Sequence, residues 1–308
     1  MIDNAGVAII HYGEPVVTMR CVSSLLSQIA PSQIVVIANS PVDAEAFLGC
    51  HVLAQVTNQG YGGAVNAAAR FAEDVGWTRL VVTNNDVVFL PAGVSTLFSE
   101  ISLGEQQTVV APLILWGDTD KVWSYGGYLS KWRAIGLNRL KSQPIPSVES
   151  RALLSSSTFI SGCCFGAPVN LLRERPFETE YFLYYEDAKW CLDLERLSTA
   201  NLIVSKEAAI RHYPSSSTGI KTPLYLYYNT RNRMFFASAI GGFPGFVGLA
   251  YSLLGMVKNV IVQIITGNKP GALAVLRAWQ DFVAGRLGRV ATNDGHFLSI
   301  AQKNHAGD

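Results

Sequence analysis

Charged side chains are scarce in this sequence: Asp, Glu, Lys and Arg make up 15% of the 308 residues, whereas hydrophobic residues make up 49%. The formal net charge is only +1, so bulk charge indicates no nucleic-acid partner. A chain with so few charges has little polar side-chain material to cover its surface. The composition therefore favours contact with a membrane surface or a large interface.

Cysteines are few as well. The five are Cys21, Cys50, Cys163, Cys164 and Cys191. Their odd number and scattered positions lack the spacing of a metal site and are typical of reduced thiols in the cytosol. Residues 1–4 show no basic flank followed by a long apolar run, so we expect no signal peptide. Internal repeats and low-complexity tracts are also absent, and the length suits one large domain or one domain with an extension.

Short apolar runs alternate with a helical pattern at the start of the chain. Residues 7–11 and 33–38 are typical of buried parallel strands, and the apolar spacing over residues 16–28 predicts a helix between them. Strand, helix and strand at this spacing form a βαβ unit. Ligands of such sheets bind beyond the carboxyl ends of the strands, where Tyr12 and Asn39 lie. Each of the two residues is equally consistent with an ordinary turn position.

A glycine-rich segment, residues 58–66, follows a weaker strand at residues 52–56 and opens a helix. Glycines before a helix allow backbone N–H groups to approach a phosphate or a sugar. The segment has neither the Gly-Lys-Ser/Thr of a Walker A loop nor the dinucleotide fingerprint. Ligand contact at Asn58, Gly60 and Asn66 is one interpretation, and a plain turn before a helix is the other.

A carboxylate closes the next buried strand, which we predict over residues 79–86 and continue through residue 91. Asp86 lies at the carboxyl edge of that run. A carboxylate there can hold Mg²⁺ or Mn²⁺, which prefer oxygen ligands and share them with substrate phosphates. An ordinary Asx turn is the alternative.

The middle of the chain adds further strands and two candidate residues. We predict strands at residues 109–115, 159–166, 200–204 and 209–212, and a polar, loop-rich segment over residues 116–150. Gly162 marks a place where another backbone or a ligand approaches closely. His212 ends the last strand. A lone histidine is usually structural, but after an acidic site strand it is also a candidate metal or phosphate ligand.

Residues 181–194 begin as an aromatic run and change at Glu186 into an apolar pattern of helical spacing. Glu186 and Asp187 therefore lie where an aromatic segment enters a helix. N–H groups at a helix start stabilise a negative charge, and the aromatic side chains limit water. The setting suits a general base acting on a hydroxyl. The alternative is a helix with an acidic first turn beside a core aromatic cluster.

Taken in order, these segments resemble the motifs of the inverting glycosyltransferases of family 2, of the rhamnosyltransferase-like bacterial type. The resemblance covers residues 5–240. The matching segments are residues 10–12, 38–43, 58–66, 84–86 (its Asp-x-Asp metal motif), 161–164, 182–187 (its Phe-Tyr-Glu-Asp catalytic motif), and 212–232. The match is closest at Phe182-Leu-Tyr-Tyr-Glu-Asp187.

The resemblance implies a GT-A fold: an α/β, nucleotide-binding fold with a Rossmann-like, mostly parallel sheet flanked by helices. It implies a nucleoside diphosphate sugar donor with a divalent cation, Mg²⁺ or Mn²⁺, on the diphosphate. The sugar would pass to a hydroxyl of a glycan or polyprenyl-linked acceptor in bacterial surface polysaccharide synthesis, with rhamnosyl transfer as the form nearest to the resemblance. Asp187 would be the general base, supported by Glu186. Asp86 and His212 would be the metal ligands.

The donor site is likewise implied by the resemblance. Its residues would be Tyr12, which would stack on the base, with Asn39, Asn58, Gly60, Asn66, Asn85 and Gly162. Two positions depart from the family pattern. Ala38 stands where an Asp usually contacts the nucleotide, which leaves Asn39 or Asp43 for that contact or implies a different base. Asn84 stands where the first Asp of the metal motif is common, which leaves Asp86 as the only acid there.

The last part of the chain is apolar and basic. Residues 243–266 are long enough to span a bilayer, but three polar side chains interrupt them. Residues 273–287 predict a second, amphipathic helix. Residues 258–303 contain six Lys or Arg and two Asp, a balance that suits the surface of an anionic membrane.

We therefore expect a catalytic domain over residues 1–240 and membrane-associating helices over residues 241–308. The protein would be cytoplasmic and peripheral on the inner face of the cell membrane. Core or dimer packing of these helices, or a true membrane span, are the alternatives.

Two other functions remain open. A non-catalytic nucleotide-sugar-binding protein on the same fold would explain the departures at Ala38 and Asn84, although the intact Glu186-Asp187 pair argues against it. A nucleotidyltransferase should carry a Gly-rich, basic first loop, and residues 10–15 have none.

Overall fold

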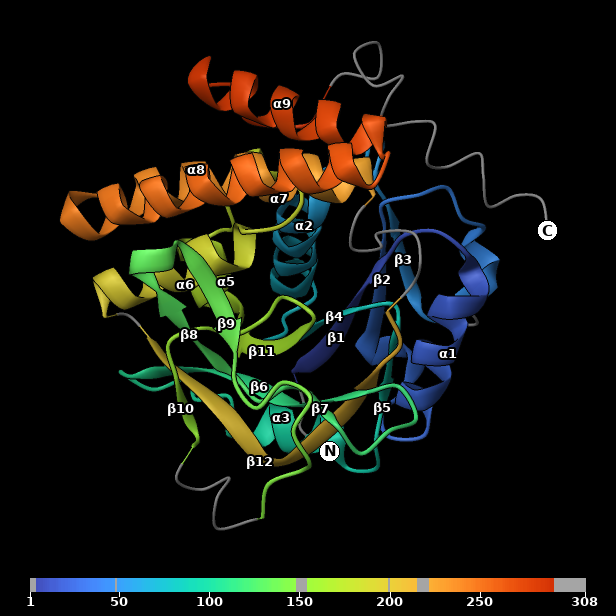
Figure 1. Ribbon diagram of the computed structural model, residues 1–308. Coiled ribbons are helices and arrows are strands. Elements are labelled where there is room, and N and C mark those ends of the chain that lie inside the picture. Colours follow the sequence, from blue (N-terminus) through green and yellow to red (C-terminus); the bar gives the residue numbers. More distant parts are fainter. Residues whose placement is uncertain (1–3, 48, 148–153, 199, 215–221, 291–308) are drawn as a thin grey trace.

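The computed structural model of the chain describes residues 4–47, 49–147, 154–198, 200–214 and 222–290 (Figure 1). Its strands are β1 (Ala5–His11), β2 (Ile34–Ala38), β3 (His51–Ala54), β4 (Arg79–Asn84), β5 (Val87–Phe89), β6 (Gln107–Trp116), β7 (Val122–Ser124), β8 (Gly127–Ser130), β9 (Ile135–Asn138), β10 (Ser156–Ser157), β11 (Cys164–Pro168) and β12 (Ala200–His212).

Its α-helices are α1 (Pro15–Leu26), α2 (Gly60–Asp74), α3 (Gly93–Glu100), α5 (Val169–Glu174), α6 (Glu186–Leu197), α7 (Pro223–Ile240), α8 (Gly242–Ile265) and α9 (Lys269–Val283). Its short 3₁₀ turns are η1 (Pro31–Gln33), η2 (Ala44–Phe47), η3 (Lys131–Arg133) and η4 (Thr179–Tyr181).

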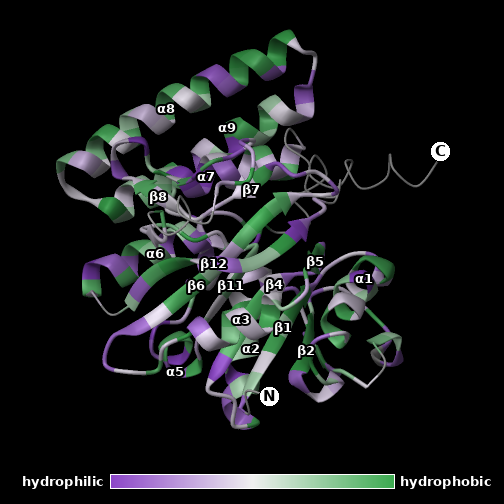
Figure 2. Cartoon of the chain, turned by 90° about the horizontal axis from the view of Figure 1, so that it is seen from below, coloured by the Kyte–Doolittle hydropathy of each residue, from purple (hydrophilic) through white to green (hydrophobic). Residues whose placement is uncertain are grey.

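A ten-stranded mixed sheet forms the centre, in the order β10-β12-β6-β11-β4-β1-β2-β3, with β5 and β7 paired to β12 and β6. Strands β3, β2, β1 and β4 are parallel neighbours. Every residue of β1 and β2 is buried, as expected for strands covered on both faces. These central strands are predominantly hydrophobic along their length (Figure 2).

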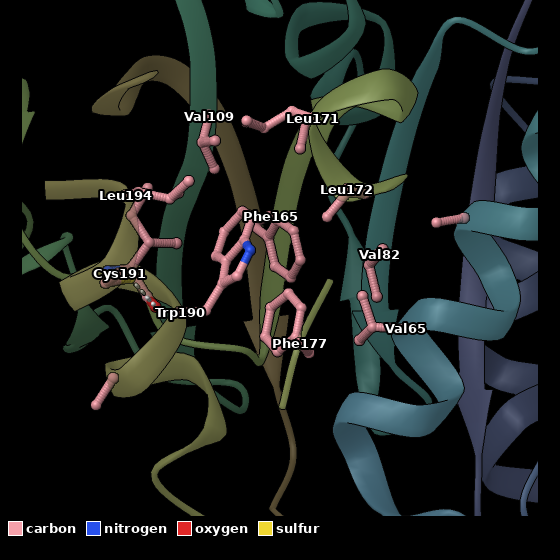
Figure 3. Close-up of a cluster of buried hydrophobic side chains, with 14 of the residues drawn as sticks. Val65, Val82, Val109, Phe165, Leu171, Leu172, Phe177, Trp190, Cys191 and Leu194 are labelled. Carbon is pink, nitrogen blue, oxygen red and sulfur yellow. Dashed lines mark hydrogen bonds between the residues drawn. The ribbon is translucent and has the colours of Figure 1, made fainter. Parts of the chain in front are cut away.

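The two faces of the sheet have separate cores. Helices α1 and α3 pack with the side chains of Val7, Ile9 and Val36 on one face. Helices α2, α5 and α6 pack on the other. There the rings of Phe177 and Trp190 stack 4.7 Å apart beside Phe165 (Figure 3). This stack holds α6, and therefore the Glu186-Asp187 pair at its start, against the sheet.

Strand β11 runs antiparallel to both of its neighbours, β4 and β6. Cys164, its first residue, lies opposite Thr83 near the end of β4. The turn that precedes β11 therefore lies at the carboxyl end of β4. The prediction of a strand from residue 159 was wrong in its start, because Gly162 belongs to this turn and the strand begins at Cys164.

Three other element predictions need correction. Residues 87–91 do not continue β4: the chain turns at Asp86, and β5 pairs with the end of β12. The segments 200–204 and 209–212 form one strand, β12, with a register shift between them. The loop-rich segment after residue 116 contains β7 and the β8-β9 hairpin. The three errors share one cause: strand pairing depends on partners that are distant in the sequence, and local periodicity does not reveal them.

The C-terminal helices form a further layer above α2 and α6 (Figure 1). Helix α7 packs against both α8 and α9, and α8 also packs on η3. Among the described helices, α8 is the one whose length and composition would suffice to cross a membrane, with 17% of its most apolar window buried. The amphipathic helix predicted over residues 273–287 is α9. All five cysteines are free, in agreement with the expectation of reduced thiols.

Candidate active site

The ends of β1, β2 and β4 bring three of the predicted donor-site residues together. The side-chain amide of Asn85 donates to the carbonyl of Tyr12 (3.1 Å) and to Thr18 Oγ1 (2.9 Å). The buried Asn39 Nδ2 donates to the carbonyl of Gly60 (3.1 Å). Asn39 Oδ1 is buried with no hydrogen-bond partner among the described residues. An unpaired buried acceptor is costly, so this atom is available for a ligand N–H.

The glycine-rich segment makes close contacts with the segment before α6. Asn58 Oδ1 accepts from the Gly60 N–H (2.8 Å). Gly60 has φ +76°, and a Cβ there would lie 2.2 Å from the carbonyl oxygen of Phe182. The Tyr61 N–H donates to that same carbonyl (3.0 Å). Gly60 thus permits the segment before α6 to approach the start of α2.

Asn66 has a comparable role. Its Nδ2 donates to the carbonyl of Phe177 and its Oδ1 accepts from the Phe177 N–H, both at 2.9 Å. These two bonds tie the start of the segment that leads to the acidic pair to helix α2.

The segment leading into α6 has an uncommon backbone. Phe182, Tyr184 and Tyr185 all have positive φ, at 63°, 66° and 75°. Residues other than glycine adopt such angles only where the surrounding structure holds them, and these cases concentrate at functional sites.

The buried Asn232 of α7 holds this segment. Its Nδ2 lies 2.8–2.9 Å from the carbonyls of Tyr181, Leu183 and Tyr184. The sequence motifs gave Asn232 no role of its own, although the polar run Asn229–Arg233 between the aromatic residues of α7 was a signal that a polar partner lies nearby.

Asp187 lies in the first turn of α6, at the wall of a pocket of about 210 Å³. Its Oδ2 accepts from the N–H of Gly162 (3.0 Å) and its Oδ1 from that of Ala188 (2.7 Å). The pocket is lined by Ile135, Gly136, Phe159, Tyr184, Tyr185, Glu186, Asp187, Ala188 and Asn229. Its walls combine the rings of Phe159, Tyr184 and Tyr185 with the polar side chains of the acidic pair and Asn229.

The two carboxyls of this pair differ in their environment. Burial raises the pKa of Glu186 to about 8, with a further rise from the charge of Asp187, and Glu186 Oε2 has no hydrogen-bond partner within the described residues. Burial also raises the pKa of Asp187, but the N–H groups of Gly162 and Ala188 oppose that rise. Because Asp187 has these donors, the negative charge of the pair resides on Asp187 and the proton on Glu186.

Asp86 and His212, far apart in the sequence, meet in the structure. Asp86 Oδ1 lies 3.3 Å from His212 Nε2, with both side chains largely buried. Two adjacent ligands of an octahedral cation with bonds of about 2.1 Å are separated by about 3 Å, so this spacing fits a shared Mg²⁺ or Mn²⁺. Within the described residues, no group of three or more His, Cys, Asp or Glu could hold a metal. The remaining ligands would come from water and substrate, which is common for these ions.

A second pocket, of about 280 Å³, opens beside this pair. It is lined by Val16, Val17, Arg20, Asn85, Asp86, Val87, Val88 and Tyr213. The turn before β11 contacts the chain beside both pairs: the Cys163 carbonyl accepts from the N–H of Asn84, two residues before Asp86 (2.9 Å), and the Gly162 N–H donates to Asp187. One short turn therefore links the strand end that leads to Asp86 with the acidic pair.

No protein-family model matches the chain, and no curated protein matches it in sequence. Solved structures do match in shape. The crystal structure of GalNAc-T7 with UDP, GalNAc and Mn²⁺ has a TM-score of 0.58 at 13% identity, covering 76% of this chain and 47% of that chain. The crystal structure of S. aureus TarS 1-349 has a TM-score of 0.51 at 14% identity, covering 89% and 80%.

At these identities the similarity shows the fold. The chain has the GT-A type of α/β architecture, a mixed and mostly parallel sheet flanked by helices, with additional C-terminal helices. The chain spans less than half the length of the GalNAc-T7 chain that it matches. The predicted fold class is confirmed.

Proposed function

We propose that the chain is an inverting glycosyltransferase that moves a sugar from a nucleoside diphosphate sugar to an acceptor hydroxyl. The observation that carries the proposal is the Asp187 carboxylate, held by two backbone N–H groups at the wall of an aromatic pocket. One turn away lies the Asp86–His212 pair. The donor class is supported by the UDP, GalNAc and Mn²⁺ in the crystals of GalNAc-T7, which has the same fold.

Asp187 acts as the general base in this proposal. It accepts the proton of the acceptor hydroxyl, and the oxygen forms a bond to the anomeric carbon as the bond from that carbon to the diphosphate oxygen breaks. The diphosphate leaves with the electron pair, and the configuration inverts. Glu186, protonated beside it, keeps the charge of the pair on Asp187. The rings of Phe159, Tyr184 and Tyr185 offer apolar faces to a sugar ring.

Asp86 and His212 would hold the cation, and Tyr12, Asn39 and Asn85 would bind the nucleotide. A bound Mg²⁺ or Mn²⁺ supplies neutralisation of the charge on the leaving diphosphate. The acceptor in this proposal is a glycan or a polyprenyl-linked sugar of bacterial surface polysaccharide synthesis. The rhamnosyl form is supported by the sequence resemblance.

A second candidate is a nucleotide-sugar-binding protein without catalysis. Ala38 and Asn84 favour it, because each stands where the family 2 glycosyltransferases usually carry an Asp.

Calorimetric titration with a panel of nucleoside diphosphate sugars, with and without Mn²⁺, separates the two. We expect one donor to bind in a metal-dependent way. Asp187→Asn should bind that donor as the wild type does but lose transfer by about 10²–10⁴-fold, because a general base contributes that much.

Asp193→Asn is the matched control, since Asp193 lies on the same helix and pairs with Lys189. Undiminished turnover in Asp187→Asn would remove Asp187 as the base. Donor binding with no transfer by the wild-type protein to any acceptor tested would favour the binding protein.

A further inference from the structure

Helix α8 turns large apolar side chains away from the protein. Eight of them along the helix are 39–78% exposed: Phe243, Phe246, Leu254, Val257, Ile261, Val262, Ile264 and Ile265. We call these residues the apolar face of α8. They span almost the whole helix, so the exposure is continuous and not a matter of single surface residues.

The fully buried residues of α8 are small or polar, although the half-buried Leu249 also packs against the core. These buried residues are Gly245, Gly248, Ser252 and Gln263. A Cβ at Gly248 would lie 2.9 Å from the carbonyl oxygen of Lys131 in η3, so the helix packs closely there. A helix between a core and water has its apolar residues inside and its polar residues outside. In α8 large apolar side chains cover the outer side as well, which indicates that its outer environment is apolar.

The exposed charges of the C-terminal helices are positive. Between residues 241 and 290 the sole acidic residue is Asp281. It is buried and paired with Arg277 (3.1 Å) and Arg286 (2.7 Å). Lys258, Lys269 and Arg289 are exposed. The layer therefore presents positive charge around an apolar surface, a combination that binds anionic lipid headgroups.

We propose that the apolar face of α8 docks, in the plane of the surface, on a lipid bilayer that contains anionic lipids. The helix contacts the folded body from Gly245 to Gln263, about 27 Å at 1.5 Å per residue, so lipid cannot surround it as in a membrane span. At one end, the rings of Trp132 and Phe243 lie 5.8 Å apart and are both exposed. Aromatic side chains favour this interfacial depth.

A second copy of the chain fits this face less well. Lys258 lies within the apolar face of α8 and is exposed. If two copies buried this face against each other, the Lys258 ammonium would need a carboxylate as its partner. Neither α8 nor α9 exposes one. Against a bilayer, the lysine can extend its ammonium to the headgroups.

The docked orientation also places the Asp187 pocket near the membrane, and its use for a lipid-linked acceptor rests on the proposed function. Helix α8 packs on η3, and Ile135 and Gly136, which follow η3, line the pocket of Asp187. The pocket therefore lies next to the docked end of the molecule, where a lipid-linked acceptor would arrive. Vesicle binding can be measured without any sugar transfer, so failure of one proposal is distinguishable from failure of the other.

The test is flotation of the full-length protein with phosphatidylcholine vesicles, with and without phosphatidylglycerol. We expect the wild type to float with the anionic vesicles. A triple variant, Phe246→Gln, Leu254→Gln and Ile261→Gln, should partition at least about tenfold more weakly, because it removes three inserted side chains. A matched control, Val75→Gln with Leu103→Gln, changes exposed apolar residues outside the C-terminal helices and should partition as the wild type does.

Three results would overturn the proposal: a wild type that floats with neither vesicle, a triple variant that floats as well as the wild type, or a wild-type dimer that persists on vesicles while the triple variant is monomeric. Thermal unfolding of each variant checks its fold. Quenching of Leu254→Trp fluorescence by brominated acyl chains gives a second readout in a variant that keeps the face apolar. We expect quenching above that of the wild type, and no increase would also contradict the proposal.

Discussion

Glu186 carries a buried carboxyl group, and its Oε2 has no hydrogen-bond partner among the described residues. Burial raises its pKa from 4.5 to about 8, so between these pH values the native state holds a proton that the unfolded state has lost. The free energy of unfolding therefore falls as the pH rises through this window. Glu186→Gln, which mimics the protonated side chain, removes this loss.

We expect Glu186→Gln to unfold like the wild type at pH 5 and to be more stable by at least about 1 kcal/mol at pH 9, since one pKa unit corresponds to about 1.4 kcal/mol. Urea unfolding at the two pH values measures the difference. Glu45→Gln, at an exposed carboxyl, should show no such pH dependence. An equal effect of Glu186→Gln at both pH values would mean that Glu186 is ionised in the native state.

A second prediction at the scale of residues concerns Mn²⁺ binding by Asp86 and His212. Loss of one of the two proposed protein ligands should weaken Mn²⁺ binding in the presence of UDP by at least about 10-fold for His212→Ala, since loss of a residue that only supports a ligand costs about 10–100-fold. Asp86→Asn should weaken it further, because it also removes the negative charge. Electron paramagnetic resonance of free Mn²⁺ measures the bound fraction. Asp120→Asn, at a highly exposed acid, is the control, and Mn²⁺ binding that survives in both ligand variants would place the cation elsewhere.

At the scale of elements, the segment before α6 depends on α7. Three carbonyl groups of that segment accept hydrogen bonds from Asn232, and three of its residues have positive φ. Asn232 is thus a positioning residue for Asp187. The backbone that it holds is the one that sets where the carboxylate points.

Asn232→Ala should lower kcat at least tenfold and leave the KM for the donor nearly unchanged, because the donor-binding strand ends are untouched. It should also destabilise the protein by about 2 kcal/mol, since buried carbonyls lose their donors. Steady-state kinetics and urea unfolding measure both effects. Asn201→Ala, at an exposed side chain that accepts a hydrogen bond from Gln106, should change neither. A rise in donor KM at unchanged kcat would assign Asn232 to substrate binding instead.

At the scale of the whole molecule, the C-terminal helices are joined to the site by buried polar contacts. Tyr227 of α7 donates to Asp281 of α9 (2.6 Å), and Arg231, also of α7, donates to the carbonyl of Gly288 (2.9 Å). Arg231 is buried next to Asn232. The boundary between residues 240 and 241 stays a prediction, and these contacts indicate that the two parts stabilise each other.

Deletion of residues 243–308 should therefore lower the melting temperature by about 10 °C or more, or prevent folding, because it leaves the buried Arg231 and the face of α7 uncovered. Thermal unfolding and limited proteolysis measure the effect. A truncated protein with the wild-type melting temperature would show that residues 1–242 fold on their own. This is why point substitutions on the outer side of α8 test membrane docking better than truncation does.

The sequence predicted β1, α1 and β2 well, and it placed the start of α6 at Glu186. Continuous burial leaves runs of apolar residues, and amphipathic helices leave a repeat of 3.6 residues, so both are local signals. The same signals misplaced β5 and the start of β11. Asp86 was compatible with a turn, but no local signal showed that β5 pairs with β12, because that pairing joins segments distant in the sequence.

By itself, the sequence determined which chemical groups are present and where the local pattern changes: the Glu186-Asp187 pair at a helix start, Asp86 at a strand end, and an apolar C-terminal segment. Only the tertiary structure decided three further points. It brought His212 to Asp86, it brought Gly60 and Asn66 into contact with the segment that leads to the acidic pair, and it turned the large side chains of α8 outward. The physical reason is the same in each case. Periodicity records that a side chain is buried or apolar, whereas the identity of its neighbour depends on strand order and helix packing across the whole chain.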